Sequence, residues 1–393
     1  MIILHAAPVK WGRLAGLSAS VPGLVAAQNA LPDVEAALLT TVSRDAWRCD
    51  SFPVFGSAAI CRRTGRPDLP APFDRPDLVV FHSTYIPLHA RLARYLRQAA
   101  IPYLICPRGG MTRYSHAGKR WKKTAANLLF FNRVVRGAKA LQFLTPGEAE
   151  ASAAWKAPFF VLGNGVDLPE FQSTDVAGQR QGTSHAAFSV ETNAGESGLQ
   201  LQPIGKCRPR RIVFMGRLHI DHKGLDMLLH ACALIARELA QAGIVVEIFG
   251  PDCGGSAKQL AAQIARDRTQ EVVALRGPTS GADKMELLAT TDVFVHPSRT
   301  EGQPMAVLEA LAHGVPCLLT PNTNMAEAVE KAAAGWRIDA SVEGIAQGLR
   351  SVIRLPGDVL SQAARNARSL AEKSFSWQEI ARRSVAEYRR FAA

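Results

Sequence analysis

Two glutamates with seven residues between them, Glu301 and Glu309, are the residues of this sequence best suited to chemistry. The apolar run 292–295 before them predicts a buried parallel strand, and the Ala/Leu-rich segment 304–313 predicts a helix after a Pro/Ser/Gly loop. Glu301 then lies in the loop, and Glu309 lies about one and a half turns into the helix. Backbone N–H groups at the helix start can hold a phosphate, and a carboxylate on each side can bind sugar hydroxyls.

Two cations follow an earlier predicted strand, 211–215. Gly216 ends that strand, Arg217 comes next, and Lys223 precedes a predicted helix that starts at Gly224. Because open α/β sheets bind ligands at the carboxyl ends of their strands, we expect both cations at that edge. They could neutralise a diphosphate and stabilise it as a leaving group when a sugar–phosphate bond breaks.

Strands and helices alternate on both sides of a polar segment, 170–210. In the first half we expect strands at 2–5, 77–81, 103–106, 140–144 and 158–162, with helices at 86–98 and 119–136. In the second half we expect strands at 211–215, 245–249, 272–275, 292–295 and 316–319. Helices are expected there at 224–240, 256–267, 284–289, 304–313, 324–333, 341–353, 360–373 and 377–391. This alternation predicts an α/β fold with two doubly wound parallel sheets.

The domain organisation follows from these elements. A chain of 393 residues, 47% of them hydrophobic, is long enough for two cores. We expect a first domain at 1–168, a linker or insertion at 169–209 because of its Gln, Ser, Thr and Gly content, and a second domain at 210–375. The weakly apolar stretch 14–27 is interpreted as part of a strand and glycine loop, and not as a secretion signal.

Several motifs carry a family resemblance. They are the segment 296–316 with its paired glutamates, Phe214-Met215-Gly216-Arg217-Leu218 followed by Lys223-Gly224, and Pro107-Arg108-Gly109-Gly110-Met111. Together they resemble the retaining glycosyltransferases of family four, which have the GT-B fold of two Rossmann-like domains facing a cleft. The loop 107–111 resembles the Pro-Arg-Gly-Met loop of bacterial exopolysaccharide and O-antigen glycosyltransferases. The resemblance implies that the last segment, 376–393, forms a helix that crosses back to the first domain.

The resemblance also implies an activity. It is the metal-independent, retaining transfer of a hexosyl group from a nucleotide sugar to a glycan, or to a polyprenyl-diphosphate-linked glycan, in surface polysaccharide biosynthesis. No cofactor is expected. The implied catalytic residues are Glu301, His82, Arg217 and Lys223. The implied donor-binding residues are Gly216, Arg217, Lys223, Gly250, Arg276, Glu301, Gly302, Gln303, Pro304, Met305, Leu308 and Glu309. The implied acceptor-side residues are Gly12, Gly16, His82, Arg108 and Asn164.

Charge is unevenly distributed. Between Asp77 and Glu148 the sequence has no acidic residue but twelve Lys and Arg residues, a number equal to the net charge of +12. Such a basic face is suited to bind an anionic membrane surface or a phosphorylated acceptor. An equally good interpretation is a solvated surface that keeps the protein in solution. A nucleic-acid-binding protein is an alternative, although no nucleic-acid module is recognisable and no such partner is expected. An epimerase or a phosphorylase with the same fold is another alternative, because fold alone does not decide function.

The remaining composition bounds the setting. The seven cysteines are dispersed without a Cys-x-x-Cys pair, which favours reduced thiols in the cytoplasm over a disulfide framework or a zinc site. No Asp-x-Asp pair occurs, so a metal-bound diphosphate is not expected. No apolar stretch reaches the roughly 18 residues that a membrane span needs. We therefore expect a cytoplasmic protein, with peripheral association at the inner face of the membrane as a further expectation.

Overall fold

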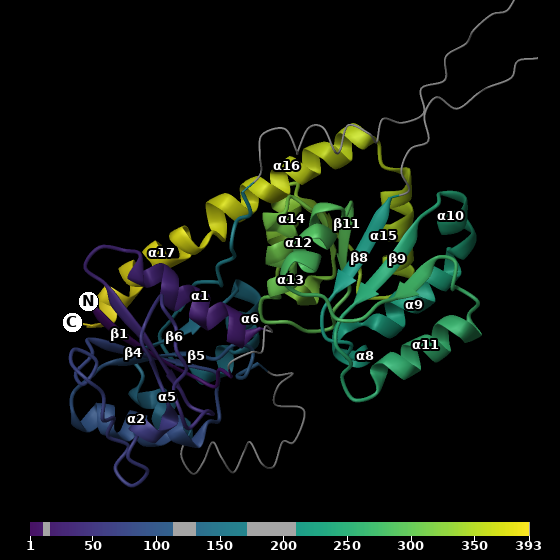
Figure 1. The fold of residues 1–393 in the computed structure, drawn as a ribbon. Helices are drawn as coiled ribbons and strands as arrows, with labels where there is room; N and C mark the ends of the chain where they lie inside the picture. The colour runs from purple at the N-terminus through teal and green to yellow at the C-terminus, as the bar shows by residue number, and fades with distance from the viewer. Residues whose placement is uncertain (11–15, 113–130, 171–209, 393) are drawn as a thin grey trace, which may run out of the picture.

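The computed structural model describes residues 1–10, 16–112, 131–170 and 210–392. Two parallel sheets organise these residues, one of seven strands and one of six (Figure 1). Helices cover both faces of each sheet, as the predicted doubly wound α/β architecture requires. The predicted fold class is therefore confirmed.

The first sheet has the strand order β3-β2-β1-β4-β5-β6-β7, and every neighbouring pair is parallel. Its strands are β1 (Ile2–Ala7), β2 (Glu35–Thr40), β3 (Val54–Phe55), β4 (Leu78–His82), β5 (Tyr103–Cys106), β6 (Ala140–Phe143) and β7 (Phe159–Val161). The helices of this half are α1 (Leu17–Asn29), α2 (Pro87–Gln98), α5 (Asn132–Gly137) and α6 (Pro146–Ala151).

The second sheet has the order β10-β9-β8-β11-β12-β13 and is also parallel. Its strands are β8 (Arg211–Met215), β9 (Val245–Phe249), β10 (Val273–Leu275), β11 (Val293–His296), β12 (Cys317–Leu319) and β13 (Gly335–Arg337). Its helices are α8 (Ile220–Lys223), α9 (Leu225–Leu234), α10 (Ala236–Gln241), α11 (Ser256–Arg266), α12 (Gly281–Ala289), α13 (Met305–Ala312), α14 (Ala326–Lys331), α15 (Val342–Arg354) and α16 (Gly357–Ser374).

Both sheets reverse their strand order at one place. In the first sheet β1 lies between β2 and β4, and in the second sheet β8 lies between β9 and β11. Helices on opposite faces diverge at such a reversal and leave space at the carboxyl ends of the two central strands. The ends of β1 and β4, and of β8 and β11, are therefore where each sheet is suited to bind a ligand.

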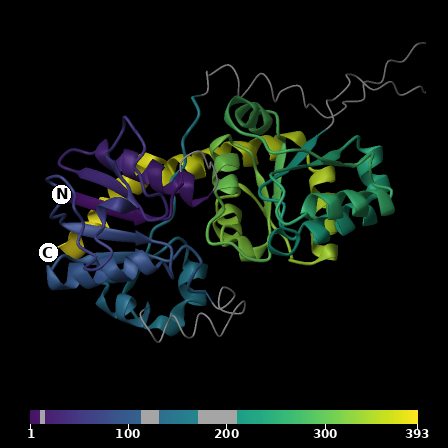
Figure 2. The ribbon, with the colours of Figure 1, turned by 60° about the horizontal axis from the view of Figure 1, so that its bottom comes forward.

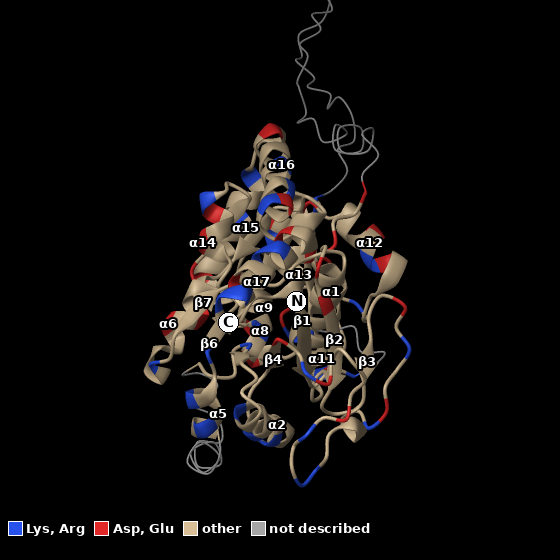
Figure 3. Ribbon diagram, turned by 90° about the vertical axis from the view of Figure 1, so that its left-hand side faces the viewer, with Lys and Arg blue, Asp and Glu red and all other residues tan. Residues whose placement is uncertain are grey.

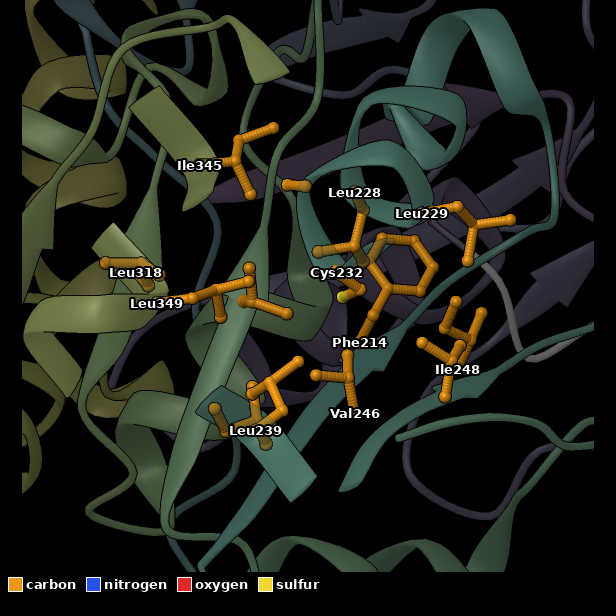
Figure 4. Packing of buried hydrophobic residues seen from close by; sticks show 14 of the residues in the cluster. Phe214, Leu228, Leu229, Cys232, Leu239, Val246, Ile248, Leu318, Ile345 and Leu349 are labelled. Carbon is orange, nitrogen blue, oxygen red and sulfur yellow. The ribbon is translucent and has the colours of Figure 1, made fainter. Parts of the chain in front are cut away.

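Hydrophobic packing explains why the strands are continuous apolar runs. Along β1, Ile3 and Ala7 join the core on one face of the sheet, while Leu4 and Ala6 join the core on the other face. Both faces are therefore buried, so no strand position needs a polar residue. The second sheet is built in the same way: Figure 4 shows Phe214, Val246 and Ile248 of the sheet packed against side chains of α9 and α15.

The C-terminal helices span both halves. Helix α16 packs on α13 of the second half, and α17 (Trp377–Ala392) packs on α1 of the first half (Figures 1 and 2). Where the chain returns, Val166 N donates to the carbonyl oxygen of Phe375 (2.7 Å), and Val166 forms a parallel bridge with Ser376. The outgoing and returning connections thus lie side by side.

Several element predictions need correction. The predicted helix 224–240 is two helices, α9 and α10, separated at Ile235, which is buried in the core. The stretch 14–27, interpreted as strand and glycine loop, contains helix α1 from residue 17 onward. Strands β2, β3 and β13 were not predicted. Most of the predicted helix 119–136 lies outside the described residues, with α5 covering its end.

Candidate functional site

Two glycines bring the ends of β8 and β9 into backbone contact. Gly216 N donates to the carbonyl oxygen of Phe249 (3.0 Å), and Leu218 N donates to that of Pro251 (2.9 Å). A Cβ atom added to Gly250 would overlap the carbonyl oxygen of Gly216. Gly250 also has a φ of 156°, which side-chain-bearing residues rarely adopt. The two glycines predicted for the donor site therefore shape the edge of the sheet beside Arg217.

Lys223 and Glu301 form an ion pair beside this edge. The carboxylate oxygen Oε1 of Glu301 also accepts from Ser298 Oγ (3.0 Å) and contacts His296 Nε2 (3.3 Å). All three contacts fall on Oε1, and no group in the described part of the chain bonds Oε2. Glu301 can therefore offer its second oxygen to a hydroxyl group while the first holds the site together.

The electrostatics of the pair favour the charged carboxylate. Burial raises the pKa of Glu301, but the hydrogen bond from His296 and the charge of Lys223 oppose it, and the net effect is a pKa well below the usual range. Burial lowers the pKa of His296, so this ring is neutral at neutral pH and donates from Nε2 to Glu301. The site therefore keeps one anion and one cation in close contact.

The loop that carries Glu301 is fixed to the start of α9. Arg299 makes a bidentate pair with Asp226, with both nitrogen–oxygen distances at 2.7 Å. Gly224 has a φ of 65°, and a Cβ there would overlap the carbonyl oxygen of Pro297. This close backbone approach, available only to glycine, aligns Lys223 with Glu301.

Arg217 lies exposed directly after β8. Its side chain makes no hydrogen bond or ion pair with the described residues. Helix α13 follows β11, the strand next to β8, and begins at Met305 after a loop that contains Gly302, Gln303 and Pro304. The first N–H groups of α13 therefore face the same edge of the sheet. An exposed cation and a helix N-terminus at one sheet edge can bind an anion.

The second glutamate has a different partner. Glu309 Oε1 accepts from Lys284 Nζ of α12 (3.1 Å), and both side chains are partly exposed. The adjacent Leu308 is fully buried in the core below α13, which does not support its predicted contact with a donor. Glu309 thus remains reachable by a ligand, whereas Leu308 holds the helix on the sheet.

Arg276 is directed away from the predicted site. Its Nε donates to Glu247 Oε1 (3.0 Å), and Glu247 also pairs with Arg211 at the opposite end of β8. The guanidinium of Arg276 therefore lies along the face of the sheet, and its donor contact stays a prediction.

Loops of the two sheets meet at Gly302 and Gln303. Gln303 Oε1 accepts from the backbone N–H of Asn164 (2.6 Å), and Gln303 is buried. Thr145 Oγ1 donates to the carbonyl oxygen of Gly302 (3.3 Å). Asn164 and Thr145 follow strands of the first sheet, so the carboxyl edges of the two sheets approach each other here. The predicted donor residue Gln303 and acceptor-side residue Asn164 are in direct contact.

His82, one of the implied acceptor-side residues, is buried and does not project into an open cleft. The residue is 0% exposed at the end of β4. Its Nε2 contacts His5 Nδ1 (2.8 Å), and its Nδ1 accepts from Arg108 Nε (3.2 Å). Arg108 also donates from Nη1 to Asn164 Oδ1 (2.9 Å). The structure therefore brings three predicted acceptor-side residues together, but both nitrogens of His82 are occupied.

Other residues of the site were not predicted or lie outside it. Gly12 is outside the described residues, and Gly16 precedes α1 with a φ of 55°. Lys284, His296 and Asn324 also belong to the site and were not predicted. Asn324 Nδ2 donates to the carbonyl oxygen of Glu301 (2.6 Å). Of these three, His296 could have been recognised from the sequence, because it ends a strand as His82 does.

The described residues contain no group of three or more His, Cys, Asp or Glu side chains that could hold a metal ion. None of the helices in the same ranges combines the length and apolar character needed to cross a bilayer.

Comparisons with known proteins identify the family. Residues 209–354 match the family model "Glycosyl transferases group 1", and residues 15–165 match "Glycosyl transferase 4-like domain". AmsK of Erwinia amylovora, named an amylovoran biosynthesis glycosyltransferase, is 32% identical over 190 residues, 46% of this chain and 44% of AmsK. WcaL of Escherichia coli (strain K12), provisionally named a colanic acid biosynthesis glycosyltransferase, is 29% identical over 181 residues, 44% of this chain and 43% of WcaL. The chain thus spans less than half the length of these relatives.

A solved structure supports the fold. HepE of Anabaena, crystallised in complex with UDP, superposes with a TM-score of 0.66 at 18% identity, over 99% of both chains. The match at 15–165 falls in the half that contains the first sheet, and the match at 209–354 falls in the half that contains the second sheet. The chain therefore belongs to the group 1 glycosyl transferases and has their GT-B fold.

Proposed function

We propose that this protein is a retaining glycosyltransferase that moves a hexosyl group from a nucleotide sugar to a glycan or polyprenyl-diphosphate-linked glycan. The observation that carries the proposal is the grouping of Lys223, Glu301 and Arg217 beside the start of α13, at the carboxyl edge of the second sheet. That edge lies next to the reversal of strand order between β8 and β11, where open α/β sheets bind ligands.

Each group has a role in the proposed transfer. Arg217, Lys223 and the N-terminus of α13 stabilise negative charge on the departing diphosphate, which is the charge that grows as the sugar–phosphate bond breaks. Glu301 binds sugar hydroxyls through Oε2, and Glu309 binds the ribose hydroxyls. No side chain is assigned as a covalent nucleophile, so catalysis rests on positioning and charge stabilisation.

These positive groups also lead us to propose that the transfer needs no metal ion. Two cations and a helix N-terminus can supply the charge that a divalent cation gives to a diphosphate elsewhere. Transfer should then continue at full rate in excess EDTA. A loss of activity that Mg²⁺ or Mn²⁺ restores would contradict this part of the proposal.

The acceptor is proposed to be an intermediate of surface polysaccharide assembly. AmsK and WcaL are named for amylovoran and colanic acid biosynthesis, which supports this setting. Helices α2 and α5 carry five exposed arginines without an acidic residue, and Figure 3 shows their blue segments next to each other. These are Arg91, Arg94, Arg97, Arg133 and Arg136. We therefore propose peripheral binding at the cytoplasmic face of the membrane.

Vesicle sedimentation tests the membrane part by itself. The protein should sediment with vesicles containing phosphatidylglycerol and stay in solution with pure phosphatidylcholine, and added salt should release it. Equal behaviour with both vesicles would remove the membrane from the proposal but leave the transfer reaction.

Thermal stabilisation by nucleotides tests the donor site. The full chain, Arg217→Ala and a control variant at an exposed arginine on α10, Arg237→Ala, are melted with UDP, GDP, ADP, dTDP and their common sugars. A ligand that binds only the folded protein raises its Tm by mass action. We expect one nucleotide family to raise the Tm of the wild type and of Arg237→Ala, but not of Arg217→Ala. UDP is the first probe because HepE was crystallised with it. No shift with any nucleotide would sink the proposal.

A further inference from the structure

A series of buried and partly buried hydrogen bonds crosses the first sheet and ends beside Gln303. It starts on α17, where Ser384 Oγ donates to the carbonyl oxygen of Ala381 (2.7 Å) and accepts from Gln28 Nε2 (2.8 Å). From there each member bonds the next at separations between 2.7 and 3.2 Å. We call this series the polar path, and its members are Ser384, Gln28, His5, His82, Arg108 and Asn164.

One assignment of donors and acceptors satisfies all the hydrogen bonds at the start of the polar path. Because the hydroxyl hydrogen of Ser384 is used on Ala381, Gln28 must turn its NH2 group toward Ser384. Its Oε1 then faces His5 Nε2 (2.7 Å), so His5 carries its proton on Nε2. The bare Nδ1 of His5 can only accept a hydrogen bond, and it accepts from His82 Nε2.

The tautomer of His82 is fixed in the same way. With its proton on Nε2, its Nδ1 is an acceptor, which matches the Nε–H of Arg108 beside it. The other tautomer would place two N–H groups against each other in a buried site and leave both unsatisfied. Burial lowers the pKa of His5 to about 4 and also lowers the pKa of His82, so both rings are neutral at neutral pH.

Arg108 transmits this arrangement to the second sheet. Its backbone has a φ of 52°, which is costly for a residue with a side chain and must be held by its surroundings. Its Nη1 donates to Ser20 Oγ (2.8 Å) and Asn164 Oδ1 (2.9 Å). Asn164 in turn donates its backbone N–H to Gln303 Oε1, which fixes the turn at Gly302 and Gln303.

We propose that Gln28 and His5 are positioning residues of the transfer reaction. They hold His82 in the tautomer that accepts from Arg108, and Arg108 and Asn164 thereby hold the Gly302–Gln303 turn against the first sheet. The inference rests on the proposed function, because a turn that binds the donor must be held at the correct distance from an acceptor on the other sheet.

Nitrogen-15 NMR of the histidine-labelled full chain measures the tautomers directly. His5 and His82, assigned with the variants His5→Gln and His82→Gln, should both be neutral and protonated on Nε2 at pH 7. In Gln28→Met, which cannot accept from His5, both should become tautomer mixtures. A wild-type His82 protonated on Nδ1, or a charged one, would overturn the proposal whether or not the protein transfers sugar.

Kinetics with a matched control separate positioning from folding. Gln142 is also buried and bonds α17, through the hydroxyl of Tyr388 (2.8 Å), but it lies outside the polar path. We expect Gln28→Met to lower kcat by about tenfold or more, as small displacements of reacting groups do. Gln142→Met should keep kcat, and both should bind the nucleotide as the wild type does. Equal losses of kcat in the two variants would overturn the proposal.

Failure of this inference and failure of the proposed function give different results. The substrate is UDP-glucose, or the nucleotide sugar that gives the largest Tm shift, and release of the nucleotide is measured. If Gln28→Met does not fold, Ser384→Ala replaces it, because it removes one hydroxyl at the same end of the polar path. If the wild type neither binds nor consumes any nucleotide sugar, the proposed function fails, whereas the NMR result still decides the tautomers.

Discussion

The ammonium group of Lys223 is paired with the carboxylate of Glu301, 78 positions later in the sequence. The side chains are only 10% and 11% exposed, so neither charge is well solvated. Each ion therefore depends on the other. In the proposed reaction the same cation would also stabilise the leaving diphosphate, so the pair couples the stability of the site to its chemistry.

Breaking this pair should destabilise the fold. Lys223→Met leaves a buried carboxylate without its cation, and we expect the free energy of unfolding to fall by about 3 kcal/mol. Glu301→Gln should lower the free energy of unfolding by less than Lys223→Met does, because the amide oxygen of the glutamine still accepts from Ser298. A double-mutant cycle from urea unfolding should give a coupling of about 1–3 kcal/mol. Additive effects would mean that the two charges do not interact.

The contact between Gly216 and Gly250 gives a second prediction. Gly250→Ala places a methyl group against the carbonyl oxygen of Gly216 and should destabilise the protein by about 1–3 kcal/mol. It should also reduce the nucleotide-dependent Tm shift, because the strand ends beside Arg217 must separate. Gly277→Ala is the control, since a Cβ at Gly277 meets no atom within 4 Å. Similar denaturation midpoints for the two variants would contradict the packing argument.

A buried histidine predicts how stability depends on pH. His89 packs on Phe81 (ring centroids 4.7 Å apart), its Nε2 has no hydrogen-bond partner among the described residues, and burial lowers its pKa to about 3. In the unfolded chain His89 binds a proton near pH 6.5, whereas in the folded chain it stays neutral at that pH. The free energy of unfolding therefore decreases as pH falls below 6.5. This histidine alone should cost about 2 kcal/mol between pH 7 and pH 5.

The variant His89→Leu isolates this effect. It removes the titrating group and the unpartnered nitrogen, so the variant should lose less stability on acidification than the wild type. Urea unfolding at pH 7, 6 and 5 measures the free energy of unfolding of both proteins. The difference between His89→Leu and the wild type should change by about 2 kcal/mol over this range, in favour of the variant at low pH. A gap that stays constant with pH would show that His89 is not the group responsible.

The sequence alone predicted the parts of the fold that depend on local pattern. Central strands such as β4, β5, β11 and β12 are buried, mostly apolar runs. The order of Arg217, Lys223 and the paired glutamates placed these residues at one sheet edge. The proximity of Lys223 and Glu301 follows from the parallel alignment of β8 and β11, whose carboxyl ends meet at that edge.

Features that depend on packing between distant segments could not be predicted. Helix α1 is covered by both the first sheet and α17, so it lacks the polar face by which a helix is recognised. The burial of His82 depends on His5 and Arg108, and the contact of Gln303 with Asn164 depends on how the two sheets meet. No local pattern encodes these contacts, because the partners lie 26 to 139 positions apart.

Glu309 provides a prediction for the nucleotide itself. In the structure its Oε1 accepts from Lys284 Nζ, and its side chain remains partly exposed, so it can bind a ribose hydroxyl. A hydrogen bond to a charged group contributes about 1.5–3 kcal/mol, so the wild type should bind UDP roughly 10- to 100-fold more tightly than 2′-deoxy-UDP. Glu309→Ala should bind the two nucleotides with nearly equal affinity, while Lys284→Met should still discriminate because the carboxylate remains. Isothermal titration calorimetry measures all six affinities. Discrimination that persists in Glu309→Ala would assign the ribose contact to another residue and leave Glu309 as the partner of Lys284 alone.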